Sequence, residues 1–120
     1  MSFPPATLTL LARTREVDIE TRSDKGAAHR VPIWVVVDGE DVFVRTYRGE
    51  KSRWYRELRA APGALVAGSK RIGVRAVPAT DRESIRRTSD AYRAKYAKSG
   101  SLNSMLRQAV LDTTLRLEPA

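Results

Sequence analysis

The chain has 120 residues, a formal net charge of +8, one histidine and no cysteine. This length suits a single hydrophobic core, and we expect one domain over residues 1–120. The lack of cysteine excludes disulfides, thiolate metal sites and thiol nucleophiles. Because His29 is the only histidine, a histidine-based metal centre or a catalytic triad is not expected either. A lone histidine of this kind is typically a polar residue in a loop or at a strand edge.

The positive charge is spread along the whole chain among acidic residues. The sequence contains no helix-turn-helix, zinc-finger or ribonucleoprotein pattern. The charge therefore indicates an anionic ligand without choosing between a phosphate cofactor and a polymer, and nucleic-acid binding rests on charge alone. No segment is apolar over the length of a transmembrane helix, and the N-terminus lacks the features of a signal peptide. We therefore expect a cytoplasmic protein.

The first half of the chain combines one helical pattern with three strand patterns. Residues 5–15 favour a short helix, and residues 17–22 alternate apolar and polar side chains, as a half-buried strand does. Residues 31–37 are apolar on both faces, which predicts a strand covered on both sides. Residues 38–41 indicate a hairpin turn. The returning strand over residues 42–47 places Arg45 on the face opposite Val44 and Thr46.

The second half predicts helices inserted between further strands. Residues 52–60 favour a short helix that ends at Pro62-Gly63, and residues 65–67 and 72–77 favour a second hairpin. Residues 80–83 have the spacing of a capping box and predict a helix that runs to about residue 98. Another short helix is expected over residues 102–111 and a closing strand over residues 113–118. The fold class that follows is mainly β with α additions, a six-stranded antiparallel barrel whose central hairpin is residues 31–47.

The segment between the central hairpin and the short helix has the composition of an anion site. Arg48, Lys51 and Arg53 lie within a few residues of one another, and the first N–H groups of a helix attract negative charge. Ser52 is expected to cap this helix with its hydroxyl. A phosphate is the simplest ligand that fits. A solvated basic turn explains the same residues about equally well.

Several segments together resemble a known fold family. The order of elements, with residues 30–39 leading to residues 42–46, resembles the split β-barrel proteins related to pyridoxamine-phosphate oxidase. Residues 53–63 are similar to the "WY-x-N-L-x-A-x-P" helix of deazaflavin-dependent nitroreductases. Taken together, residues 33–36, 44–45, 54–56, 91–96 and 114–117 resemble a small uncharacterised family within that fold. The resemblance covers residues 17–118.

This resemblance implies an FMN-binding type of split barrel, which forms a homodimer with a flavin or deazaflavin at the subunit interface. The cofactor would be flavin mononucleotide (FMN) or the deazaflavin coenzyme. Its phosphate would contact Arg45, Thr46, Arg48, Lys51, Ser52 and Arg53, and its ring would lie along Ile33, Trp34 and Val35. The implied activity is hydride transfer to an unknown small molecule, which suits a chain without a strong candidate for general acid or nucleophile. The alternative is a non-catalytic cofactor-binding or structural protein on the same barrel.

The aromatic residues also have simpler structural explanations. Trp34, in an apolar strand, is more often a core or dimer-interface residue than a wall that stacks on a ring, and Trp54 is interpreted as structural. Tyr92 and Tyr96 lie four residues apart and favour a core stripe, with a Tyr96 hydroxyl in a substrate pocket as the minor alternative. An isolated barrel would expose Trp34 or Phe43, which gives a second reason to expect a dimer.

Two sets of basic residues are interpreted from their surroundings. Arg86, Arg87, Lys95 and Lys98 are expected to lie on solvated helix faces. Arg45 needs an anion if its side of the strand is buried, and needs no partner if that side is open.

Overall fold

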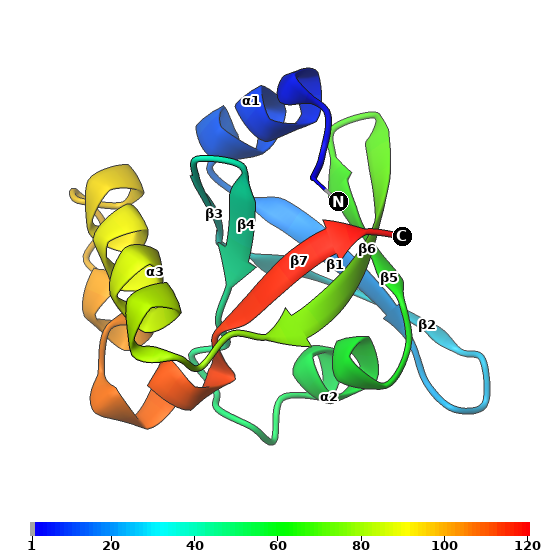
Figure 1. Cartoon of the computed structure of the whole chain (residues 1–120). Coiled ribbons are helices and arrows are strands. Elements are labelled where there is room, and N and C mark those ends of the chain that lie inside the picture. Colours follow the sequence, from blue (N-terminus) through cyan, green and yellow to red (C-terminus); the bar gives the residue numbers. More distant parts are fainter. Residues whose placement is uncertain (1) are drawn as a thin grey trace.

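The computed structural model describes residues 2–120, in which seven strands form one antiparallel sheet. The order across the sheet is β2-β1-β5-β6-β7-β4-β3, and the sheet curls around a common core (Figure 1). The strands are β1 Val17–Arg22, β2 Ala28–Ile33, β3 Val35–Asp38, β4 Asp41–Val44, β5 Gly63–Ala67, β6 Lys70–Pro78 and β7 Leu115–Pro119. The helices are α1 Pro5–Arg13, α2 Arg53–Ala60 and α3 Arg82–Lys95, followed by the 3-10 helices η1 Leu102–Met105 and η2 Gln108–Thr113.

The expected count of six strands differs from the observed seven because the segment 31–37 divides at Trp34. Before Trp34 the chain pairs with β1, where Val17 lies opposite Ile33. After Trp34 it pairs with β4, where Val35 lies opposite Val44. One continuous segment therefore supplies both edges of the seven-stranded order, β2 at one end and β3 at the other. This transfer curls the sheet into a half-barrel, and a local pattern of apolar residues does not reveal it.

Cover on both faces, predicted for residues 31–37, is confirmed in β3 but not in β2, where Pro32 is exposed, and β4 is also covered on both faces. Val35 and Val44 belong to the main core inside the curled sheet, together with residues of α1 and α2 such as Leu11 and Leu58. Val36 and Phe43 point the other way and pack with Tyr92, Tyr96 and Met105 in a second cluster. Because α3 packs against β3, it buries Phe43 within the same chain. Phe43 therefore provides no exposed patch to support the dimer expected from it.

The helix boundaries follow the sequence closely, but two capping predictions were wrong. Ser52 precedes α2 without forming a side-chain capping hydrogen bond. A capping box over residues 80–83 would make Thr80 the capping residue of α3. The capping residue is instead Asp81, whose carboxylate accepts a hydrogen bond from the Ser84 N–H over 3.0 Å. The residues expected to form a regular helix at 102–111 instead contribute to the 3-10 helices η1 and η2.

The hairpin β3–β4 turns at Gly39, which has a φ of +63°, a value that favours glycine. Arg87 of α3 joins both sides of this turn, because its guanidinium donates to the Asp38 carboxylate over 2.5 Å and to the Asp41 carboxylate over 2.8 Å. The expectation of a solvated face was therefore wrong for Arg87. It was also wrong for Lys95, which is half-buried and donates to the Leu11 and Val35 carbonyls. The two aspartates raise the pKa of the Arg87 guanidinium.

Candidate functional site

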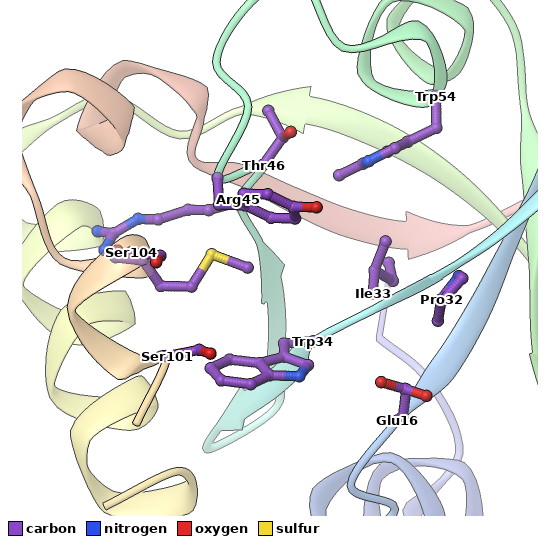
Figure 2. A pocket seen from close by; sticks show the side chains of 11 residues that line it. Glu16, Pro32, Ile33, Trp34, Arg45, Thr46, Trp54, Ser101 and Ser104 are labelled. Atoms are coloured by element: carbon purple, nitrogen blue, oxygen red, sulfur yellow. Dashed lines mark hydrogen bonds between the residues drawn. The ribbon is translucent and has the colours of Figure 1, made fainter. Parts of the chain in front are cut away.

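One of the surface cavities, here called the aromatic cavity, lies beside the point where β2 becomes β3. Its volume is about 390 Å³. Trp34 and Trp54 lie on opposite sides of it in Figure 2. Its polar groups include the carboxylate of Glu16 and the hydroxyls of Ser101 and Ser104. The complete lining is Glu16, Pro32, Ile33, Trp34, Arg45, Thr46, Tyr47, Trp54, Ser101, Ser104 and Met105.

Residues of α3 hold the Trp34 wall in place. The indole of Trp34 stacks on the ring of Tyr96, with centroids 4.0 Å apart and planes at 4°. The Tyr92 hydroxyl donates to the Trp34 carbonyl over 2.7 Å and accepts from the Arg45 N–H over 3.1 Å. The Tyr96 hydroxyl donates to the Arg15 carbonyl, so that hydroxyl is engaged outside the cavity. Burial raises the pKa of both tyrosines, which therefore remain neutral donors.

The second cavity, here called the basic cavity, adjoins the first and has a volume of about 560 Å³. The two cavities share four lining residues, Pro32, Thr46, Tyr47 and Trp54. The others in the basic cavity are His29, Val31, Arg48, Lys51, Ser52 and Arg53. None of the residues that line the basic cavity is acidic, and three of them, Arg48, Lys51 and Arg53, are arginine or lysine. The two adjoining cavities, one with Trp34 in its lining and the other with the cations, are together called the groove here.

Hydrogen bonds between residues two or three positions apart shape the loop that carries these cations. The Gly49 N–H donates to the Thr46 carbonyl, and the Ser52 N–H donates to the Gly49 carbonyl, over 3.2 and 3.1 Å. Gly49 has a φ of +80°, in the left-handed region that glycine adopts without steric cost. The Arg48 N–H donates to the Thr46 hydroxyl over 3.3 Å. These contacts turn the chain so that Lys51 and Arg53 face the same cavity as Thr46.

The guanidinium of Arg45 is directed away from the cavities, toward α3 and η1 (Figure 2). Arg45 is completely buried. Its four hydrogen bonds, of 2.8–2.9 Å, reach the Thr114 and Ser89 hydroxyls and the Met105 and Ile85 carbonyls. Burial lowers its pKa, and neutral oxygens satisfy it without an anion. The expected need for an anion was wrong, and Arg45 contributes only its side-chain stem to the aromatic cavity.

Val35 also differs from the expected site. Its side chain is completely buried in the main core, and it lines neither cavity. Its carbonyl accepts a hydrogen bond from Lys95, just as the Trp34 carbonyl accepts one from Tyr92. The carbonyls of Trp34 and Val35 therefore each already accept a hydrogen bond from another part of the chain.

The other predicted site residues do line the groove. Ile33 and Trp34 face the aromatic cavity, Thr46 faces both, and Arg48, Lys51, Ser52 and Arg53 face the basic cavity. Sequence reasoning missed the roles of Tyr47 and Trp54, which line both cavities. Tyr47 is 49% exposed, and its place in an apolar–polar alternation next to the basic loop was the available signal. Ser101, Ser104 and Met105 gave no local signal, because they are distant in sequence.

The described residues also limit the kinds of site that the chain offers. Within residues 2–120, no group of three or more histidine, cysteine, aspartate or glutamate side chains is placed to hold a metal ion. Nor does this part of the chain contain a helix with the length and apolar character needed to cross a bilayer.

Comparison with solved structures defines the class of fold. A 15% identical match covers 95% of this chain and 50% of ChuZ from Campylobacter jejuni, with a TM-score of 0.70, so the chain spans half the length of that protein. A candidate pyridoxamine 5'-phosphate oxidase from Listeria innocua is 11% identical with a TM-score of 0.66, over 95% of this chain and 90% of the other. An F420 reductase is 17% identical with a TM-score of 0.59, and the match covers 98% of this chain and 96% of the reductase. These likenesses show a split-barrel fold.

The family follows from the sequence itself. Residues 7–117 match the family DUF2255, described as "uncharacterized protein conserved in bacteria", and the chain belongs to that family. A search of proteins with curated functions found no match. The resemblance to a small family within the split-barrel fold is thereby confirmed.

Proposed function

We propose that this protein binds a flavin-type cofactor, FMN or the deazaflavin coenzyme, along the groove formed by the two cavities. The observation that carries the proposal is the continuity of an aromatic cavity and a basic cavity through shared residues. A flavin-type cofactor has the matching two-part chemistry, a flat ring and a phosphate. Cavities of this size, mostly apolar with a few convergent polar groups, are typical of cofactor sites.

The basic cavity would hold the phosphate. Lys51 and Arg53 are its principal cations, Arg48 assists, and Thr46 and Ser52 add hydroxyl groups. The Ser52 hydroxyl is free of the expected capping bond, which leaves it available to a ligand. The cavity lies at the start of α2, whose first turn contains no acidic residue. Charge-assisted hydrogen bonds to phosphate and the helix N-terminus act in the same direction here.

The aromatic cavity would hold the ring between Trp34 and Trp54, with Ile33 as an apolar contact. Tyr96 supports the far face of Trp34, so the indole keeps its orientation when a ring enters. Such a cofactor would supply hydride-transfer chemistry, while the chain binds and orients it and excludes water. The hydride would pass to a small molecule whose identity the groove does not define. A cofactor-binding protein without turnover is the alternative that the same groove supports.

The test is a titration of FMN and of the deazaflavin coenzyme into the wild-type protein. Quenching of tryptophan emission is a direct readout, because the only two tryptophans, Trp34 and Trp54, both line the aromatic cavity. In the double variant Lys51→Ala/Arg53→Ala we expect each lost charged contact to weaken binding by roughly 1.5–3 kcal/mol, or about ten- to a hundredfold.

The matched control is Lys25→Ala/Arg56→Ala, which removes the same charge from two exposed positions that line neither cavity. This control should bind as the wild type does. Equal binding by the Lys51/Arg53 variant would show that the loop is not the phosphate site. Failure of the wild type to bind either cofactor at high micromolar concentration would refute the cofactor proposal itself.

We further propose that the protein acts as a homodimer, with the groove near the subunit interface as in the split-barrel proteins that it resembles. The exposed ring of Tyr47 at the junction of the two cavities supports this placement. Light scattering at micromolar concentration should give the mass of two chains. A monomer at that concentration would contradict the proposal.

A further inference from the structure

The only histidine of the chain lines the basic cavity and is held by a partly buried carboxylate. His29 lies in β2 opposite Thr21 of β1, and its Nδ1 is 3.1 Å from Oε1 of Glu57 on α2. The Thr21 hydroxyl donates to the same Oε1 over 2.8 Å. The side chains of His29 and Glu57 are 24% and 12% exposed. The imidazole is therefore fixed on one side and open to the cavity on the other.

The carboxylate determines which imidazole nitrogen carries the proton. Burial tends to raise the pKa of Glu57, but hydrogen bonds from Thr21 and His29 outweigh it and keep that pKa below its usual value. An ionised carboxylate can only accept hydrogen bonds, so Nδ1 of His29 must be the protonated nitrogen. Nε2 is then a bare acceptor in the neutral ring and becomes a donor only in the imidazolium.

We propose that His29 is an anion-binding residue of the basic cavity, whose imidazolium donates from Nε2 to the same oxyanion that Lys51 and Arg53 bind. The inference rests on the proposed function only for the location of the anionic group, and it applies to any phosphate-like or sulfate-like oxyanion. Because the neutral ring presents a lone pair to the cavity, the oxyanion and a proton bind together. Glu57 positions the ring and stabilises its positive charge.

The other charged groups around His29 keep their charge while an imidazole titrates. From α2 these are Glu57 and Arg53, and from the preceding loop they are Arg48 and Lys51. On its own strand, Arg30 is paired with Glu20 of β1. Arginine and lysine side chains in general remain cationic between about pH 5 and pH 8, and carboxylates with lowered pKa values remain ionised. A change of anion affinity across that interval therefore reports on His29.

Sulfate is the appropriate probe, because its own charge does not change over this interval. Calorimetric titration of sulfate into the wild-type protein should show affinity increasing on the order of tenfold from pH 8 to pH 5. The variant His29→Gln should bind sulfate weakly and with little dependence on pH. The variant Thr21→Val keeps His29 but removes the second hydrogen bond to Glu57, so it should lose stability yet retain the pH dependence.

A second measurement needs no substitution. Because His29 is the only histidine, its imidazole proton resonance can be followed by NMR in the wild-type protein. Its titration midpoint should move to higher pH when sulfate is added. An unchanged midpoint, or a His29→Gln variant with the wild-type affinity and pH profile, would overturn the proposal. Sulfate binding without binding of FMN or the deazaflavin would refute the proposed cofactor and leave this inference standing.

Discussion

Arg45 and the three cations that follow it in sequence have opposite surroundings. Arg45 is completely buried and donates four hydrogen bonds to neutral oxygens of the protein. Arg48, Lys51 and Arg53 are exposed and line a cavity without acidic lining residues. A positive charge near a site is therefore no evidence of ligand binding until its partners are known. Removal of the buried Arg45 should therefore lower the stability of the fold. Removal of the exposed cations should instead lower the affinity for a ligand.

The largest effect is expected at Arg45. The variant Arg45→Leu removes the hydrogen bonds that Arg45 donates to two hydroxyls and two carbonyls of α3, η1 and the residue before β7. Each unsatisfied buried group costs about 1–3 kcal/mol, so the free energy of unfolding should fall by about 4 kcal/mol, a large part of a typical total. Chemical denaturation measures it, with Arg56→Ala on exposed helix surface as a control that changes little. A loss below about 1 kcal/mol would contradict the structural role of Arg45.

Lys95 is intermediate between the buried Arg45 and the exposed cations. It is half-buried, and its ammonium donates to the Leu11 and Val35 carbonyls. Burial lowers its pKa from the ordinary 10.5 to about 8. Between these values the unfolded chain binds more protons than the folded one, so the free energy of unfolding should rise with pH across that window. We expect a contribution of about 1 kcal/mol, reduced from the full shift because the side chain is partly exposed.

The measurement is denaturation of the wild type and of Lys95→Met at the two ends of that window. The variant cannot titrate at this position and should lack this part of the pH dependence, while its side chain still packs between α1 and β3. If the free energy of unfolding changed with pH equally in both proteins, the ammonium of Lys95 would not be destabilised by its surroundings.

The smallest effect on stability is expected for Lys51→Ala/Arg53→Ala. Neither side chain forms an ion pair among the described residues, and surface substitutions of this kind usually change stability by less than about 0.5 kcal/mol. The midpoint of thermal unfolding without ligand should therefore match that of the wild type. A variant destabilised as strongly as Arg45→Leu would remove the contrast between the two groups of cations.

The candidate site was predictable to the extent that it is local. Residues 48–52 lie on the loop before α2 and Arg53 is the first residue of that helix, so their convergence on one cavity could be expected from their spacing. The aromatic cavity could not, because Ser101 and Ser104 reach Trp34 only through the packing of α3 and η1 beside β3. The His29–Glu57 pair was missed for the same reason, since 28 residues separate its members.

The sequence by itself determined the features that depend on near neighbours. Alternation set the inner and outer faces of β1 and β4, Asp38-Gly39 set the hairpin turn, and the spacing of the basic residues brought three cations to one cavity. The tertiary structure alone decided that the chain changes partners at Trp34, that Arg45 turns away from the groove, and that His29 turns toward it. The physical reason is that strand and helix patterns follow from local backbone geometry, whereas strand partners and buried hydrogen bonds are chosen among groups distant in sequence that meet only when the sheet curls.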